Sequence, residues 1–266
     1  RRCGYREGQV SAMTTLANQL RSAFFLASRD AYVKGAFVLP ALLAVSTILL
    51  VLLFPDANMH VMFESGLLGI VRTGALFGTC LAMAGIVTHD VSSGGLRAAV
   101  LAERGRGGYV ASRVILALVL AVLLGVWSVL LGMAPLLGPR VVFEGMPAGE
   151  LALRVAAHVL VGWTYAVFGM LLLWLARSPR GFASAFFAAV ILGAGVLNAL
   201  LLVPVAVLIP LSQELAFGAF QLIVPILPSS LLADAFVADA RLVVLPVAYV
   251  IVFWALSRRV MARAPL

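Results

Sequence analysis

The residues of this chain that could support catalysis or metal binding are few and widely separated. Its histidines and cysteines are His60, His89, His158, Cys3 and Cys80. Cys80 lies inside an apolar stretch, so we expect neither a structural disulfide nor a cysteine metal cluster. His89 is close in sequence to Ser92 and Ser93, but no Gly-x-Ser-x-Gly motif is present. The sequence therefore gives little support to a serine nucleophile.

ATP hydrolysis by this chain is not expected either. A phosphate-binding loop needs the pattern Gly-x-x-x-x-Gly-Lys-Ser/Thr, whose backbone amides surround the phosphates. The chain has a single lysine, Lys34, and no such glycines precede it. We therefore predict a non-catalytic chain that binds no cofactor and no metal.

A few polar residues interrupt otherwise apolar stretches. Arg72 is the most prominent, because an arginine at membrane depth marks a functional site unless its side chain reaches the surface. Both alternatives stay open, and a polar path or a partner contact is the functional one. His158 lies one helical turn from Arg154, which indicates either a small polar face or an interfacial anchor. Asn198 is expected to make an interhelical hydrogen bond more often than to bind a substrate.

Two glycines, Gly74 and Gly78, form a Gly-x-x-x-Gly face in one apolar stretch. Small residues at this spacing let two helix backbones approach closely. The contact could lie within one subunit or at a dimer interface, and the sequence does not distinguish the two. Trp163, Tyr165 and Trp174 are expected to be packing or membrane-interface residues.

The composition shows what kind of element must position these residues. Of 266 residues, 63% are hydrophobic and 11% are charged, and the mean hydropathy is +1.11. A soluble domain of this length would need more polar surface, whereas apolar runs of about 20 residues suit transmembrane helices. The runs do not alternate as barrel strands do. We predict an all-α membrane protein with six spans, at residues 36–54, 67–87, 114–137, 151–176, 182–211 and 242–257.

The arginines predict the orientation of these spans. Basic residues concentrate in alternate connections, which the positive-inside rule places in the cytoplasm. This explains the net charge of +8 without nucleic-acid binding. Both termini are then cytoplasmic, in a bacterial inner membrane. The basic residues of that side are Arg1, Arg2, Arg6, Arg21, Arg29, Lys34, Arg97, Arg104, Arg106, Arg113, Arg177, Arg180, Arg258, Arg259 and Arg263.

Three segments outside the six spans are informative. Residues 1–13 are expected to be a disordered extension before a single transmembrane domain at 14–266, and Met13 would be a natural start. Residues 14–35 have helical spacing of apolar side chains, which favours an amphipathic helix on the membrane surface over a simple lead-in to the first span. Residues 212–241 are apolar but interrupted by Pro225 and Pro228, which predicts a re-entrant or interfacial hairpin. A seventh span would place the basic C-terminus outside.

The connection between the second and third spans has the most specific pattern. Asp90 ends the second span, and Ser92 or Ser93 could cap a short helix. Leu96, Val100 and Leu101 would form one apolar face, with Arg97 and Glu103 at its flanks, glycines end it, and Arg113 opens the third span. A short amphipathic helix on a cytoplasmic loop is a docking element for another protein.

This pattern resembles the type-2 ABC exporter permeases. In that family the second span leads into an acid, a Gly-Thr-Leu-Arg-like helix start, an apolar helix, a basic turn and a basic residue entering the third span. Here these are Asp90, residues 95–97, residues 100–101, residues 104–109 and Arg113. Residues 226–236 also look like the proline-containing segment before the family's last span. The resemblance covers nearly the whole chain through loose motifs, with Gly94-Gly95 in place of Gly-Thr. The nearest kind is the small permeases of drug or antibiotic export.

The resemblance implies a division of labour between subunits. A separate P-loop ATPase would bind MgATP, and a second permease copy or a related chain would complete the translocation path in the lipid bilayer. The cargo would be a drug, an antibiotic, a peptide or a lipid-like molecule. The loop at residues 90–109 would be the coupling helix that docks on the ATPase, through Asp90, Leu96, Arg97, Val100, Leu101, Glu103 and Arg104.

Other functions remain as alternatives. An ion-coupled secondary transporter would need acids at membrane depth, whereas the eleven acids here lie in or near connections. An intramembrane enzyme has less support, because the chain has no recognisable nucleophile and base at membrane depth. A protein that protects its host from an antimicrobial compound would use the same exporter machinery.

Overall fold

The structure is a computed structural model, and it describes most of the chain. The described residues are 18, 21–25, 27–53, 59–93, 105–134, 147–176, 193–228, 230–233 and 240–263. Within them, the side chains of residues 51, 59–65, 176, 193–199 and 233 are not described. The predicted extension at 1–13 and most of the predicted coupling helix, residues 94–104, lie outside these ranges.

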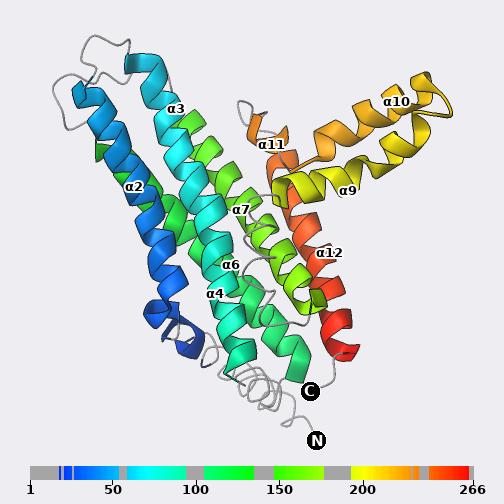
Figure 1. Ribbon diagram of the computed structural model, residues 1–266, viewed down its shortest axis with the longest axis horizontal. Helices are drawn as coiled ribbons and strands as arrows, with labels where there is room; N and C mark the ends of the chain where they lie inside the picture. Colours follow the sequence, from blue (N-terminus) through cyan, green and yellow to red (C-terminus); the bar gives the residue numbers. More distant parts are fainter. Residues whose placement is uncertain are drawn as a thin grey trace, which may run out of the picture.

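The described part of the chain is helical and contains no strand (Figure 1). Five helical stretches in it are long and apolar enough to cross a membrane: Ala31–Leu50, Gly66–Ser92, Gly105–Gly132, Ala148–Leu175 and Arg241–Arg263. The prediction of an all-α protein that crosses the membrane several times is therefore confirmed. The helices extend beyond the predicted spans, because the apolar windows mark the hydrocarbon region while the helices continue past it.

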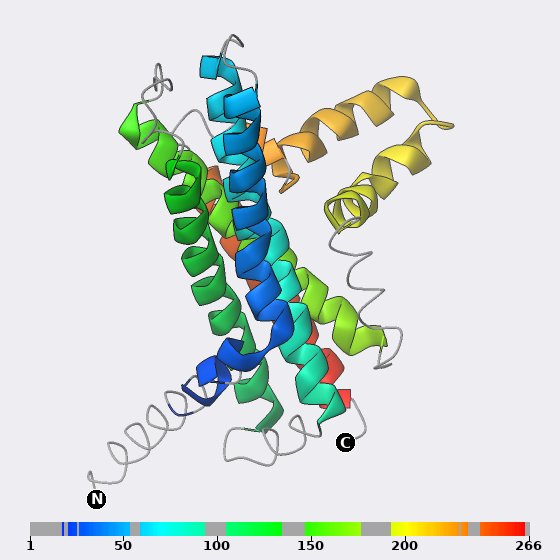
Figure 2. The ribbon, with the colours of Figure 1, turned by 60° about the vertical axis from the view of Figure 1, so that its left-hand side comes forward.

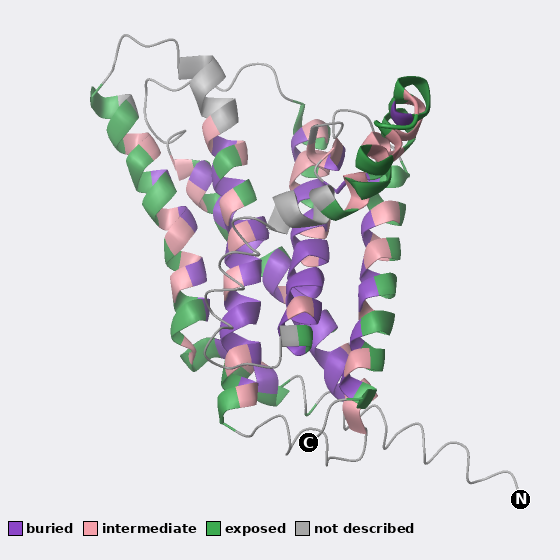
Figure 3. Cartoon of the chain, turned by 45° about the vertical axis from the view of Figure 1, so that its right-hand side comes forward, coloured by how far each residue is buried: buried purple, intermediate pink, exposed green. Residues whose placement is uncertain are grey.

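The bundle is built from long neighbouring helices that contact one another along their lengths. They are α2 (Ala31–Leu53), α3 (Met59–Arg72), η1 (Thr73–Gly78), α4 (Thr79–Ser92), α6 (Gly105–Gly132), α7 (Ala148–Ala176) and α12 (Arg241–Arg263). Helices α3, η1 and α4 continue one another along the chain. Of the 18 residues taken as the apolar segment of each stretch, 78% are buried in Gly66–Ser92 and 72% in Ala148–Leu175, against 22% in Ala31–Leu50 and in Arg241–Arg263. The α3–α4 helix and α7 are therefore the centre of the bundle (Figure 3).

Successive contacts show that the first three long helices run antiparallel. A methyl group on Gly85 would touch Asp30 and Tyr32, whereas one on Gly66 would touch Thr47. On the other side, Asp90 contacts Arg113 at one end of the bundle, while a methyl group on Gly132 would touch Leu67 at the other. We call the end of the bundle that contains Asp90 the Asp90 end, and the end that contains Leu67 and Gly132 the opposite end.

Helices α7 and α12 run in the same direction, which has a consequence for topology. Thr164 donates a hydrogen bond to the carbonyl of Pro246 at 3.4 Å, and the Phe168 and Phe253 rings lie 5.1 Å apart further along both helices. Arg106, at the start of α6, contacts the carbonyl of Met261, so α12 finishes at the Asp90 end. Because α7 also finishes there, the chain between the two helices returns to the opposite end.

The middle of the α3–α4 helix is a π-helix, η1, which packs against α2 at a carbonyl that a proline of α2 leaves free. Pro40 in α2 cannot donate a hydrogen bond to the carbonyl of Ala36. A methyl group on Gly78 would lie 3.2 Å from that carbonyl oxygen, so the glycine brings the π-helix against it. A neighbouring helix commonly covers a carbonyl that proline has freed in a membrane.

The segment before α2 is helical and is interrupted at Asp30. The Asp30 Oδ1 accepts hydrogen bonds from the backbone N–H groups of Tyr32 at 2.8 Å and Val33 at 3.2 Å. Asp30 is therefore the N-cap of α2. Ala23 and Ala27 are buried against the bundle, while Phe25 is exposed. The segment predicted as an amphipathic surface helix is thus helical in its described residues, and its alanines face the bundle.

Helices α9 (Gly193–Leu208) and α10 (Gln213–Ile223) form a hairpin that projects sideways from the bundle (Figures 1 and 2). The Ser212 hydroxyl caps α10 by accepting from the N–H of Leu215 at 3.4 Å. A 3-10 turn, η3 (Val224–Ile226), and α11 (Ser230–Ala233) follow. The sequence predicted a hairpin within residues 212–241, whereas the observed hairpin is formed by α9 and α10. Its first arm is therefore the second half of the run predicted as the fifth span. With 16 residues, α9 alone is shorter than the ~20 needed to cross.

Candidate functional site

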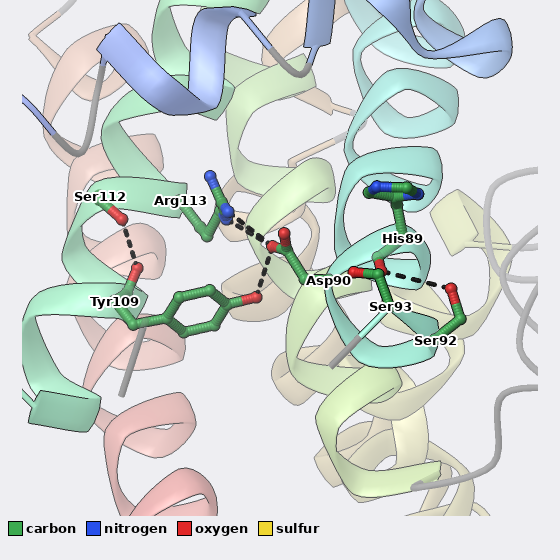
Figure 4. Close-up of polar contacts among 7 residues, drawn as sticks. All are labelled: His89, Asp90, Ser92, Ser93, Tyr109, Ser112 and Arg113. Atoms are coloured by element: carbon green, nitrogen blue, oxygen red, sulfur yellow. Dashed lines mark hydrogen bonds and ion pairs between the residues drawn. The ribbon is translucent and has the colours of Figure 1, made fainter. Parts of the chain in front are cut away.

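Three buried side chains join the two ends of the predicted coupling loop (Figure 4). They are Asp90 from α4 and Tyr109 and Arg113 from α6, which we call the Asp90 cluster. Arg113 Nε donates to Asp90 Oδ2 at 2.8 Å, and its Nη2 lies 2.7 Å from the same oxygen. The Tyr109 hydroxyl donates to that oxygen at 2.8 Å. The three residues are 4%, 2% and 6% exposed in chain order.

The environment of the Asp90 cluster makes its geometry rigid. The Arg113 guanidinium carbon lies 5.1 Å from the centre of the Tyr109 ring, and the Tyr109 and Trp174 rings meet edge to face at 6.2 Å. A buried charge that loses its partner destabilises a protein strongly, by about 3–5 kcal/mol. Because one carboxylate oxygen receives all three donors, α4 and α6 are joined firmly where the loop between them begins and ends.

The far end of the loop is also attached to α12. Gly105 has a φ of 60°, which an L-residue rarely adopts, so a glycine is suited to the turn that starts α6. Arg106 Nη1 donates to the carbonyl of Met261 at 3.0 Å and also to that of Ala262. A cation at a helix C-terminus interacts favourably with the free carbonyls there. A displacement of the loop would therefore reach α4, α6 and α12 together.

The hydroxyls of Ser92 and Ser93 contact the main chain of His89 and not its imidazole ring. The Ser93 hydroxyl donates to the main-chain carbonyl of His89 at 2.7 Å, and that of Ser92 donates to the same carbonyl at 3.3 Å. Both hydroxyls thus contact the last turn of α4. The helix that one of them was predicted to cap falls at residues 94–104, outside the described part of the chain. Figure 4 shows the His89 ring directed away from the Asp90 cluster.

The Gly-x-x-x-Gly face makes its described contacts within the chain. A methyl group on Gly74 would lie 1.8 Å from Ser128 Oγ and 3.0 Å from the carbonyl oxygen of Leu124 in α6. Gly78 faces Ala36 of α2, as described above. A third glycine, Gly162 of α7, approaches a neighbouring backbone more closely than these two, with a methyl group placed 2.0 Å from the carbonyl oxygen of Ala75. Sequence reasoning missed Gly162, which has no glycine three or four residues away.

The polar residues predicted for a path lie near the opposite end. Arg72 is exposed at the end of α3, and His158 is buried in α7. Arg154 pairs with Glu150 at 2.7 Å. The side chain of Asn198 lies outside the described part of the chain. Tyr165 and Trp174 are buried, as expected of packing residues, and Trp163 donates to the carbonyl of Val114 at 2.9 Å.

The remaining candidates for the coupling surface are not placed by the structure. Leu96, Arg97, Val100, Leu101, Glu103 and Arg104 all lie outside the described residues. Of the seven predicted coupling residues, only Asp90 is therefore located. It faces the interior of the bundle, where it pairs with Arg113.

A cavity of about 530 Å³ lies between α6 and α7, on a different face from the Asp90 cluster. Its walls are apolar, and they include Val126, Leu130, Leu151 and Val155. No polar side chain lines it, so it offers no group for catalysis or metal binding. No three metal-binding side chains gather among the described residues either.

Comparison with known proteins leaves the function to be argued from this geometry. No family model matches the chain, and no curated protein has a similar sequence.

Proposed function

We propose that this chain is the membrane-spanning permease subunit of an ATP-driven exporter. A separate P-loop subunit would hydrolyse MgATP and dock on the connection between α4 and α6. The observation that carries the proposal is the Asp90 cluster, which joins both ends of that connection through one buried carboxylate oxygen. A loop held this way transmits an applied force to the helices as a rigid-body movement.

The arrangement of the helices supports six membrane crossings. Because α7 and α12 are parallel neighbours, the chain between residues 176 and 241 crosses from one end of the bundle to the other. That crossing, added to the five candidate spans, makes six. An even number brings the described start of α2 and the end of α12 to the same end. The arginines concentrated there favour the cytoplasm for it.

A second permease copy, or a related chain, is part of the proposal. A single bundle with a tightly packed centre leaves no described polar channel through its own middle. The translocation path would therefore form between two bundles, and the cargo would be a drug, an antibiotic, a peptide or a lipid-like molecule. An ion-coupled transporter has less support, since the carboxylates of Asp90 and Glu150 are both paired with arginines.

Site-specific crosslinking from the predicted docking face tests the proposal. A photoreactive residue at position 97 or 100 should crosslink to a P-loop protein in native membranes. The same residue at Leu49, which is exposed on the membrane-facing side of α2, is the control and should not. The purified complex should hydrolyse MgATP, and replacing Leu96, Arg97 and Leu101 together by alanine should abolish both co-purification and stimulated hydrolysis.

Two results would contradict the proposal. Unchanged co-purification and turnover in the triple variant would remove the docking role of this loop. Export that continues without any ATPase, but stops when the proton gradient is collapsed, would favour a secondary transporter.

A further inference from the structure

Arg72 of α3 and His158 of α7 lie at the same level of neighbouring helices, in the half of the bundle away from Asp90. Gly162 marks the closest approach of α7 to the α3–α4 helix, at the carbonyl of Ala75. These two helices run in the same direction, so one turn earlier on each brings Arg72 beside His158.

The charges at this level are unbalanced among the described side chains. Glu150 is paired with Arg154 at 2.7 Å, and none of the described carboxylates forms an ion pair with Arg72. His158 Nδ1 lies 2.6 Å from the carbonyl oxygen of Arg154, and since a carbonyl only accepts, Nδ1 is the donor. An arginine at membrane depth is costly unless an anion or water stabilises it. The site therefore favours an anionic ligand.

The distance between Arg72 and Asp90 along the helix is close to the thickness of a bilayer core. Arg72 precedes Asp90 by 18 residues in one continuous helical stretch, or about 27 Å at 1.5 Å per residue. The hydrocarbon core is about 30 Å thick. If the paired charges of the Asp90 cluster lie near one boundary, Arg72 lies near the other, where lipid phosphates are found.

The surface next to Arg72 is open to a ligand. Gly69 lies one turn before it on the same face of α3 and is exposed, and a methyl group added there would meet no atom within 4 Å. The Thr73 hydroxyl donates to the Gly69 carbonyl at 2.8 Å and so does not occupy this space. A guanidinium can bind a phosphate through two parallel hydrogen bonds.

We propose that Arg72, supported by His158, binds the phosphate of an anionic lipid in the leaflet at the opposite end. Arg72 supplies the charge and two N–H donors, and the buried ring of His158 adds a polar wall beside it. The proposal does not depend on transport or on an ATPase, because it concerns only the surface of this chain.

The test measures lipid retention by the full chain in nanodiscs containing phosphatidylglycerol and phosphatidylcholine. After a detergent wash, native mass spectrometry should detect bound phosphatidylglycerol on the wild-type protein. Retention should fall on the order of ten-fold in Arg72→Gln, the loss expected for a charge-assisted hydrogen-bonded pair. Arg72→Lys should keep part of it, which shows that the fold is intact. Arg241→Gln, which removes an arginine from the same end, is the matched control and should retain lipid normally.

The other outcomes are equally informative. Equal retention in Arg72→Gln and the wild type would overturn the proposal and leave Arg72 as a side chain that reaches water. An equal loss in Arg241→Gln would also overturn it, because general surface charge would then explain binding. Displacement of the lipid by millimolar inorganic phosphate would show a site for free phosphate and not for a lipid.

Discussion

Two charges of the α3–α4 helix lie in opposite environments. Near the end of the helix, Asp90 is buried and receives three hydrogen-bonding contacts from Tyr109 and Arg113. Near its middle, Arg72 is exposed and has no ion pair with a described carboxylate. Both charges belong to one continuous helical stretch, so local helix geometry does not explain the difference.

The comparison shows which charge stabilises the fold and which is free for a ligand. The Asp90 cluster is satisfied within the chain, and its removal should cost folding free energy. Arg72 satisfies nothing inside the bundle, so its removal should change binding with little effect on stability.

The largest effect is expected at the Asp90 cluster. Asp90→Asn leaves the Arg113 guanidinium buried without its counter-charge and should lower the free energy of unfolding by about 3–5 kcal/mol. Arg72→Gln should change it by less than about 0.5 kcal/mol, as for most exposed positions. Equilibrium unfolding in detergent micelles measures both values.

A double variant separates the contribution of the Asp90–Arg113 ion pair from the effect of leaving one charge unpaired. Asp90→Leu combined with Arg113→Met should be more stable than either single variant, because no buried charge is then left unpaired. Similar losses of unfolding free energy in Asp90→Asn and Arg72→Gln would contradict the contrast between the two charges.

The next effect is expected where α7 crosses the π-helix, close to Arg72 along the chain. Gly162→Ala would place a methyl group 2.0 Å from the Ala75 carbonyl oxygen, and backbone atoms cannot give way as a flexible side chain can. Overpacking of this kind costs about 1–3 kcal/mol. Gly149→Ala is a control in the same helix, because its methyl group would meet nothing within 4 Å.

Thermal unfolding of these two variants in micelles checks the prediction. Gly149→Ala should be neutral or slightly stabilising, since alanine favours helices by about 0.5–1 kcal/mol over glycine. Equal stability of the two variants would mean that α7 and η1 are further apart than described.

The smallest effect is expected from a single hydroxyl. Tyr109→Phe removes one of the donors to Asp90 Oδ2 but leaves Arg113 in place, so the loss should be about 1–2 kcal/mol. Tyr249→Phe is the control, because that hydroxyl donates to the Ile226 carbonyl at an exposed position. Unfolding measurements should rank Tyr109→Phe between Asp90→Asn and Tyr249→Phe. A loss as large as that of Asp90→Asn would show that the hydroxyl, and not the ion pair, holds the cluster.

Some of this site could be predicted from the sequence. The sequence predicts Asp90 and Arg113 as the two residues between which the loop lies, because an acid or an arginine at the end of an apolar run is conspicuous. Their pairing was not predicted, since 23 residues separate them and the intervening chain could place them anywhere along the loop. Tyr109 was grouped with a basic turn, and only packing against Trp174 shows that its hydroxyl points inward.

The sequence by itself determined that the chain is helical and crosses a membrane several times, because apolar runs of bilayer length allow no other satisfied backbone. It also determined where charges occur along those runs. The tertiary structure alone decided which of them are neutralised. The register between helices sets three contacts: Gly162 with Ala75, Gly74 with Ser128, and Asp90 with Tyr109. Register depends on contacts between residues far apart in the chain. For the same reason only the folded bundle distinguishes a buried, paired aspartate from an exposed arginine on the same helix.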